Sequence, residues 1–319
     1  MSIRALLSRS DGVDEAVDLN TWNGRRVRED ELLWIDAQAP SDAERQLIAP
    51  ALSLEVATLD ALGNGAAVPD ARVLRDGIMV TVQTLAANLS DPPIALHVLI
   101  GRHWAVTWHA DEIEFLDEHH ERIQDGREVG RLTAVLFLVE VLDWHLDTYF
   151  AAAEELEREV DDLDEAALRG DEKNMLERLV MMRRRISRVR HLLGVHRDMY
   201  AEIARPDFLP APEPREAEAL AAVSHRLERA TEAVANAREM LIGTFEVHMT
   251  RTAQRTNDVM KLLTFVSVIL LPAGVIAGVM GMNFQVGFFE NPNLFWVVVG
   301  AMVAIAVTSV AVARWHDWL

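Results

Sequence analysis

The sequence predicts an α/β cytoplasmic domain, followed by a long-helix stalk and two C-terminal transmembrane helices. Three patterns predict this fold class. Short apolar segments alternate with helical ones over residues 1–130, and residues 131–280 are almost wholly helical in pattern. Two apolar runs, 260–280 and 294–313, then close the chain. Each run is as long as the roughly 20 apolar residues that a helix needs to cross a bilayer.

Residues 1–130 contain four segments with the β-rich, turn-bounded character of strands. These are residues 2–8, 32–36, 77–85 and 94–108. Ser41 precedes Asp42-Ala43-Glu44 and is placed to cap a helix that continues through Leu52. Gly63-Asn64-Gly65 predicts a turn, and it does not match a phosphate-binding loop because neither a third glycine nor Lys-Ser/Thr follows. Strands mixed with helices predict an α/β domain.

Residues 131–204 predict an antiparallel helical hairpin that is broken at Gly170. The first helix ends in a segment with eight acids and one arginine between Glu154 and Glu165, whereas the second has six arginines between Arg178 and Arg190. A short turn makes the helices neighbours, so opposite charges can face each other. A cation-attracting role for the acidic segment is the alternative. Because the acids balance the arginines, the basic stretch does not indicate nucleic-acid binding.

Composition excludes several classes of function. The 319 residues include no cysteine, which excludes disulfides, thiolate metal sites and thiol catalysis. A net charge of −19 disfavours binding to nucleic acid or to anionic lipid. No nucleophile elbow or phosphate loop is visible, so we expect no enzyme. His119 and His120 cannot share a helix face, and His191 and His196 are five residues apart, so the histidines give no metal-ligand spacing.

One uninterrupted helix is expected from Arg215 to Met280, beyond the prolines at 206, 210, 212 and 214. No break precedes the membrane, since the isolated Gly243 is tolerable in a helix. At about 1.5 Å per residue the helix is roughly 100 Å long. A single helix of that length needs partners, so we expect it to join a bundle or to pack against the α/β domain.

Charges around the two apolar runs predict that both termini are cytoplasmic. The connection 281–293 has no Lys or Arg, whereas Arg251 and Arg255 precede the first run, Lys261 stands at its start, and Arg314 follows the second. Positive residues remain on the cytoplasmic side of a membrane. The first 30 residues lack an apolar signal segment. We therefore expect a multi-pass protein of the cell's inner or plasma membrane, with residues 314–319 as a cytoplasmic tail.

Alternating steps of three and four residues define one face of the long helix, which we name the polar stripe. Its members are Glu232, Asn236, Glu239, Gly243, Glu246, Thr250, Ala253, Asn257, Met260, Thr264, Ser267, Leu271, Gly274 and Gly278. A mean spacing of about 3.5 residues keeps one face toward a bundle axis, where an ordinary coiled coil has Leu and Ile. Polar groups in a membrane span usually face protein or water. We predict that the stripe lines a pore within a ring of identical helices.

A dry helix seam is the alternative for this face. Gly274 and Gly278 form a GxxxG match, and small residues let membrane helices pack closely. A dry seam, however, would not stack three carboxylates along the cytoplasmic part of the stripe. Two spans cannot enclose a water path, so a pore requires several protomers, most simply with cyclic symmetry. Met260 and Leu271 would then form apolar collars that gate by dewetting.

The chain resembles the CorA family of divalent metal-ion transporters, which includes a ZntB branch. The resemblance rests first on Gly281-Met282-Asn283-Phe284, directly after the first span. Pro272 within that span and Asn257 and Met260 at its cytoplasmic entrance add to it. The N-terminal domain contributes Leu32-Leu33-Trp34-Ile35-Asp36. It covers essentially the whole chain. It implies a funnel-shaped homopentamer in which the first span lines the pore.

The resemblance also implies a selectivity filter formed by Gly281, Met282 and Asn283. The signature asparagine, here Asn283, would form a ring at the outer mouth and contact a hydrated cation. Mg²⁺ gives up its water reluctantly, so neutral amide oxygens can recognise the hydrated ion and still release it. Many magnesium-selective members continue with Met-Pro-Glu-Leu, whereas residues 284–292 differ here. Their one acid, Glu290, either draws cations to the mouth or is a solvated loop residue.

Three functions remain open. The first is a divalent-cation channel for Mg²⁺ that tolerates Co²⁺ or Ni²⁺, with no cofactor apart from the transported ion. The second is a Zn²⁺ transporter, coupled to protons, on the same scaffold. The third is a non-conducting, membrane-anchored oligomer that binds a partner. The family resemblance further implies sensing of intracellular Mg²⁺ at acidic sites between protomers. Glu246 falls near one such position, whereas the uncharged Ala222 and Val223 lie around another, which counts against that form of inhibition.

Overall fold

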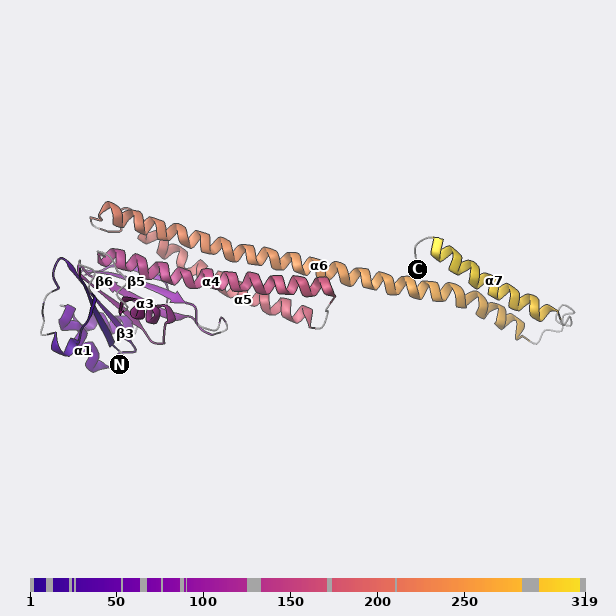
Figure 1. Ribbon diagram of the computed structural model, residues 1–319, viewed down its shortest axis with the longest axis horizontal. Helices are drawn as coiled ribbons and strands as arrows, with labels where there is room; N and C mark the ends of the chain where they lie inside the picture. The colour runs from indigo at the N-terminus through magenta and orange to yellow at the C-terminus, as the bar shows by residue number, and fades with distance from the viewer. Residues whose placement is uncertain are drawn as a thin grey trace. The chain divides into compact units, whose positions relative to one another are not determined.

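The computed structural model describes residues 3–9, 14–22, 25, 27–52, 54–63, 68–75, 77–86, 89, 91–124, 133–170, 174–209, 211–282 and 293–315. Its elements in chain order are β1 (Ile3–Arg9), β2 (Asp14–Ala16), η1 (Leu19–Thr21), β3 (Glu31–Gln38), α1 (Asp42–Leu52), α2 (Val56–Gly63), β4 (Asp70–Val73), β5 (Ile78–Thr84), β6 (Ile94–Ile100), β7 (Trp104–His109), α3 (Glu114–Gln124), α4 (Ala134–Arg169), α5 (Met175–Ile203), α6 (Pro214–Met280) and α7 (Leu294–Trp315) (Figure 1). The chain divides into an N-terminal unit, Met1–Thr244, and a C-terminal unit, Phe245–Leu319, with the boundary inside α6.

Seven strands form one sheet in the order β2-β1-β3-β7-β6-β5-β4. β3 and β7 are parallel, and the other described neighbours are antiparallel. On one face, Leu33 of β3 shares a buried cluster with Ile48 of α1 and Leu59 of α2. On the other face, Trp34 contacts Phe137 of α4, because successive strand residues point to opposite sides. Helices cover both faces, as predicted for an α/β domain.

Residues 94–108 form a hairpin, which corrects the prediction of a single strand. β6 ends at Ile100, β7 begins at Trp104, and the N–H of Gly101 donates to the Trp104 carbonyl (2.9 Å) across the turn. Only Gly-Arg-His interrupts an otherwise apolar run, so the break was hard to recognise. The short edge strands β2 and β4 and the helices α2 and α3 also have no counterpart in the sequence prediction. Most of the turn expected at Gly63-Asn64-Gly65 lies outside the described residues.

The Leu32–Asp36 segment lies in β3 and serves the core of the sheet domain. Asp36 is 1% exposed, and its carboxylate accepts hydrogen bonds from Thr107 (2.6 Å), Arg4 (2.8 Å) and His109 (3.1 Å). Burial alone would raise the pKa of Asp36, but the bonds from His109, Thr107 and Arg4 outweigh it and lower that pKa to about 2. The acid is therefore a satisfied structural anchor between β1, β3 and β7.

Local capping fixes the ends of the helices. The Ser41 N–H donates to Glu44 Oε2 (2.8 Å) and the Glu44 N–H donates to Ser41 Oγ (3.4 Å), a reciprocal capping box that confirms the predicted start of α1. Thr133 Oγ1 accepts from the Leu136 N–H (3.2 Å) at the start of α4. Gly170 ends α4 with a left-handed φ of 79°, a conformation that glycine adopts without a steric penalty.

The first part of α6 packs along α4. Its buried residues recur every three or four positions and are Leu220, Val223, Leu227, Ala230, Val234, Ala237, Leu241 and Thr244. Thr133 Oγ1 donates to Glu216 Oε1 (2.6 Å) near the starts of both helices. Farther along, the Arg226 guanidinium contacts Asp143 and Asp147 of α4. These contacts supply the partner that a helix of this length needs.

A buried polar network joins α4 and α5 to β5. His145 and His196 are both fully buried, with ring centroids 4.9 Å apart. His196 Nε2 accepts the N–H of Gln83 (2.9 Å), and the Gln83 carbonyl accepts from Tyr149 Oη (2.8 Å) and from His145 Nε2 (3.1 Å). Burial lowers the pKa of His145 well below its usual value and the pKa of His196 to about 4. Both imidazoles are therefore structural and neutral.

Mild acid should destabilise the N-terminal unit through these two histidines. Unfolding returns them to pKa values near about 6.5, so the unfolded chain binds protons that the folded chain excludes. Their contribution to stability is complete above that pH and declines as the pH falls toward the folded pKa of His196, about 4. Thermal unfolding of the full chain in detergent between pH 7.5 and 5 measures the decline.

His196→Gln should flatten this pH dependence, because glutamine can accept the Gln83 N–H without binding a proton. His225→Gln is the matched control, since His225 is exposed on α6 and should leave the pH dependence unchanged. An equal decline in all three proteins would show that the buried histidines do not cause it.

Candidate ion pathway

The N-terminal part of the polar stripe, from Glu232 to Glu246, lies opposite the buried face of α6. Each stripe residue from Glu232 to Glu246 follows a buried residue by two positions, which is a rotation of about 200°. The five residues concerned, Glu232, Asn236, Glu239, Gly243 and Glu246, are all exposed. The protomer therefore uses one face of α6 for its own core and leaves the stripe free. Val223, by contrast, is 2% exposed and lies on the core face.

In the C-terminal unit the predicted pore-lining residues are again exposed. They are Asn257, Met260, Thr264, Ser267, Leu271, Gly274 and Gly278. The half-buried residues of this segment lie on other faces and include Phe265, Ile269, Pro272 and Ile276. Among the described residues the stripe is therefore uncovered in each unit taken by itself, from Glu232 to Gly243 in the N-terminal unit and from Glu246 to Gly278 in the C-terminal unit.

The two hydroxyls of the apolar segment are satisfied by their own helix. Thr264 Oγ1 donates to the Met260 carbonyl (2.8 Å), and Ser267 Oγ donates to the Leu263 carbonyl (2.8 Å). Each oxygen keeps lone pairs that can accept a hydrogen bond from water. The hydroxyls therefore need no partner helix as acceptor, and they can accept from the hydration shell of a cation.

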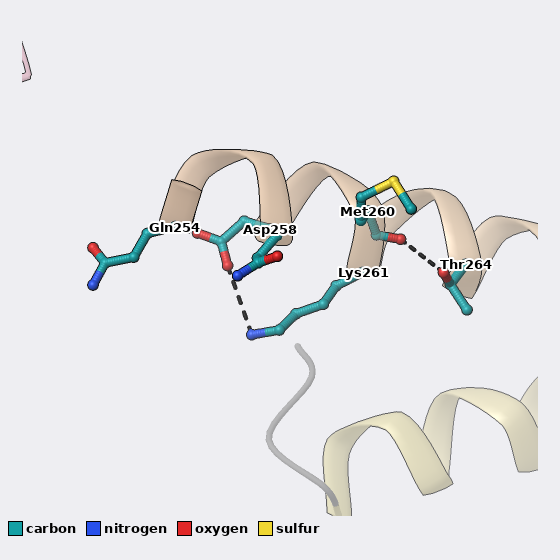
Figure 2. Close-up of a pocket in the computed structure, with 6 residues that line it drawn as sticks. Gln254, Asp258, Met260, Lys261 and Thr264 are labelled. Carbon is teal, nitrogen blue, oxygen red and sulfur yellow. Dashed lines mark hydrogen bonds and ion pairs between the residues drawn. The ribbon is translucent and has the colours of Figure 1, made fainter. Parts of the chain in front are cut away.

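Two shallow grooves of about 480 Å³ each follow the stripe. The first is lined by Gln254, Asn257, Asp258, Met260, Lys261 and Thr264 (Figure 2). In it Lys261 Nζ reaches back to Asp258 Oδ1 (3.7 Å), while Met260 points away from that pair (Figure 2). The second is lined by Leu263, Thr264, Ser267, Val268, Leu271 and Pro272. The surface thus changes from charged and polar to mainly apolar along the helix.

Gln254, Asp258 and Lys261 were not among the predicted pore residues. Asp258 and Lys261 stand three positions apart, the spacing at which opposite charges pair on a helix, so the signal was present in the sequence. Their pair lies beside the stripe and brings charge to the level of Asn257 and Met260.

Apolar residues occupy most flanking positions of the stripe outside the segment 254–261, although Arg238 and Arg251 also stand directly beside it. Residues that directly precede stripe positions include Ile242, Met249, Leu263 and Leu270, and residues that directly follow them include Val247, Val268 and Val275. Apart from the half-buried Val247, all of these are exposed. A dry coiled-coil seam has apolar residues in the stripe and charges on the flanks. The inverse pattern here suits a ring in which neighbouring helices touch through their flanks and the stripes face the axis.

The glycines of the stripe have no packing role inside one protomer. A Cβ atom added at Gly243, Gly274 or Gly278 would meet nothing within 4 Å in the described chain. The GxxxG match therefore does not serve contacts within a chain. Either a neighbouring copy or an open lumen accounts for the missing side chains.

The Gly-Met-Asn motif, which is predicted to form the selectivity filter, begins where α6 ends. The N–H of Gly281 donates to the Ala277 carbonyl (2.9 Å), the N–H of Met282 donates to the Val279 carbonyl (3.3 Å), and Met282 is half-exposed. The predicted filter residue Asn283 and the loop acid Glu290 lie outside the described residues. At the ends of α7, Trp296 and Trp315 are exposed, as aromatic residues at membrane interfaces commonly are.

Comparison with known families decides the affiliation. Residues 29–314 match the family described as CorA-like Mg2+ transporter protein. The chain belongs to this family. The resemblance inferred from the Gly-Met-Asn motif and the paired apolar runs is thus confirmed. The CorA family consists of membrane metal-ion transporters, and this member has two helices long and apolar enough to span a bilayer, within α6 and α7.

Two relatives described as cobalt/magnesium transport protein CorA show the extent of the similarity. The protein from Thermotoga maritima is 28% identical over 212 residues, which are 65% of this chain and 59% of that protein. The protein from Methanocaldococcus jannaschii is 23% identical over 291 residues, which are 90% of this chain and 92% of that protein.

Solved structures confirm the predicted fold class. The complete CorA magnesium transporter from Methanocaldococcus jannaschii matches with a TM-score of 0.81 over 100% of this chain and 99% of that chain, at 23% identity. The ZntB cytoplasmic domain from Vibrio parahaemolyticus matches 80% of this chain with a TM-score of 0.62, at 8% identity. The sheet domain, the long helix and the C-terminal helix therefore form a known CorA architecture.

Proposed function

We propose that this CorA-family member is a divalent-cation channel that conducts hydrated Mg²⁺ through a pore at the centre of a homo-oligomeric ring. The observation that supports it most is the exposed polar stripe with apolar flanks on α6. Five copies are the number that the family resemblance implies. Cyclic symmetry would bring the stripes of all copies to one axis.

The ion would meet a graded series of groups along this axis. Glu246 and Asn257 provide oxygen atoms on the cytoplasmic side, and the Thr264 and Ser267 hydroxyls accept from the water of the ion. Mg²⁺ holds its water tightly, so oxygen atoms that bind the hydrated ion avoid the cost of dehydration. The amide of Asn283 would complete the path at the outer mouth. The ion is cargo, and no cofactor is proposed.

The proposed topology places the N-terminal unit and both termini in the cytoplasm. Arg251, Arg255 and Lys261 lie before the first span and Arg314 lies after the second, whereas the connection 281–293 has neither Lys nor Arg. The protein would lie in the inner or plasma membrane of the cell. Cations would then collect on the acidic cytoplasmic side of a chain with net charge −19.

Transport of Zn²⁺ is the second candidate, because residues 284–292 lack the Met-Pro-Glu-Leu sequence of many magnesium-selective members. A comparison of fluxes into liposomes distinguishes the two. We expect the full chain to admit Mg²⁺ faster than Zn²⁺, with Co²⁺ or Ni²⁺ tolerated, and to respond only to the cation gradient. Faster Zn²⁺ uptake under an inward proton gradient would favour the second candidate. No flux of any divalent ion in either direction would favour a non-conducting oligomer.

A further inference from the structure

The α4–α5 hairpin has two opposite edges of opposite charge. Arg185 marks the edge of α5 that is turned toward α4, because its guanidinium contacts Glu155 (3.1 Å) and Glu159. Arg183 and Arg190 stand two residues before and five residues after Arg185, which places them about 200° and 140° around the helix. These two arginines therefore lie on the edge of α5 that faces away from α4.

Three acids lie on the far edge of α4 by the same geometry. Asp161 and Asp164 follow Glu159 by two and five residues, and Glu157 precedes Glu159 by two, so all three turn away from α5. They lie on the side of α4 on which Asp143, about five helical turns before Asp161, contacts Arg226 of α6. We name Glu157, Asp161 and Asp164 the acidic edge, and Arg183 and Arg190 the basic edge.

Neither edge meets its counter-charge within the described part of one chain. Asp161, Arg183 and Arg190 are exposed, and Glu157 and Asp164 are half-buried. None of the five forms an ion pair or a hydrogen bond there, although Arg185 on the same hairpin forms two ion pairs. Solubility would require charge but no segregation by sign. Separation into a negative edge and a positive edge indicates docking against a surface that offers both.

Arg183 of the basic edge also stands at the level of the acidic edge along the hairpin, whereas Arg190 lies level with residue 152. α4 and α5 are antiparallel and both rise by about 1.5 Å per residue. The contacts of Arg185 with Glu155 and Glu159 place residue 185 level with residue 157. Arg183 is then level with the gap between Glu157 and Asp161. A rotation about an axis along the hairpin leaves these levels unchanged.

We propose that the basic edge of one copy docks on the acidic edge of the next copy in the ring. This inference rests on the ring of the proposed function. α4 runs beside α6 through the contacts of Arg226 with Asp143 and Asp147, so the hairpin follows the helix that would line the axis. Cyclic symmetry then brings Arg183 opposite Glu157 and Asp161 of the neighbouring copy. Two different patches form a heterologous contact, which is the kind that closes rings.

A second copy fits these edges better than a polyanion does. Nucleic acid or anionic lipid would use only the basic edge, and the acids of the same hairpin would repel it. A neighbouring copy brings both signs of charge at matching levels. Partly covered ion pairs of this kind contribute mainly to the choice and register of the partner.

Cross-linking between copies tests the contact directly, because the native chain contains no cysteine. Full-length Asp161→Cys and Arg183→Cys chains with different tags are co-expressed, purified in detergent and oxidised mildly. Each chain has one thiol, so every disulfide joins two copies. With equal amounts of randomly mixed chains, about one interface in four carries the two thiols in the right order, so we expect up to about half of the protein in a dimer band that contains both tags. The matched control is Asp162→Cys with Arg184→Cys, one position around each helix, for which we expect no such band.

Light scattering on the same samples separates failure of the contact from failure of the ring. A ring with the mixed dimer band supports the proposal. A ring without that band, or with Asp161→Cys chains joined only to each other, overturns the contact and leaves the proposed channel intact. Absence of any ring overturns the assembly on which both proposals depend.

Charge exchange provides a second readout. Arg183→Glu should shift the assembly toward smaller species at low protein concentration, and adding Asp161→Arg to the same chain should restore the ring. If Arg183→Glu weakens the assembly and Asp161→Arg does not restore it, Arg183 stabilises the fold of a single copy. That result would contradict the proposed contact.

Discussion

Asn283→Ala is expected to reduce Mg²⁺ flux to the level of protein-free liposomes. The alanine cannot form a hydrogen bond to the water of the approaching ion. If each amide contributes about 1 kcal/mol, a ring of five loses about 5 kcal/mol, which corresponds to more than about a thousandfold in affinity for the hydrated ion. The measurement is dye-reported Mg²⁺ uptake into liposomes that contain equal amounts of assembled protein.

Asn291→Ala is the matched control, because it makes the same change within the same connection but outside the signature motif. We expect it to retain most of the wild-type flux. Undiminished flux in Asn283→Ala, at the wild-type oligomer size, would remove Asn283 from the filter. Equal losses in both variants would indicate a general requirement for the loop instead.

Met260→Ala is expected to produce a leak in the closed state. Met260 is 56% exposed in the protomer, so its truncation removes little from the core of one chain. In the proposed ring it forms an apolar collar that excludes water. Burial of one such side chain contributes about 2 kcal/mol. Its loss would shift the ratio of water-filled to dry pores by roughly thirtyfold. Single-channel recording across a planar bilayer measures the baseline current between openings.

Leu262→Ala separates the collar from a general loss of apolar surface. Leu262 is 58% exposed and lies two positions from Met260, about 200° around the helix. We expect no leak from this variant. Leu271→Ala, at the second proposed collar, should leak in the same direction as Met260→Ala. A closed-state current that Met260→Ala leaves unchanged would exclude the collar at this position.

The long helices of the molecule could be predicted almost to their ends, whereas the short helices α2 and α3 were not predicted. The helix expected from Arg215 to Met280 is observed as Pro214–Met280, since the prolines before it and the glycine after it mark both boundaries. Ser41 and Glu44 similarly revealed the start of α1. Local capping chemistry and apolar periodicity depend on neighbours in the sequence, so they can be recognised without the fold.

Features that depend on distant contacts could not be predicted. The turn at Gly101 separates two apolar strands that pair with each other, and only the pairing distinguishes them from one long strand. The partners of Asp36 come from β1 and β7, far along the chain. The stripe could be listed from its spacing, but the sequence did not show that the opposite face of α6 is occupied by its own domain. The filter roles of Gly281, Met282 and Asn283 stay predictions.

The hydroxyls of Thr264 and Ser267 lower the free-energy cost of removing water from the proposed pore. Each hydroxyl already donates a hydrogen bond to a carbonyl one turn back in the same helix. Loss of water from the lumen therefore leaves no hydroxyl donor unsatisfied. A pore lining of this kind would have a similar free energy in a dry lumen and in a water-filled one. Opening and closing would then require only a small change in pore diameter at the Met260 and Leu271 collars. No hydrogen bonds along the pore lining would have to break.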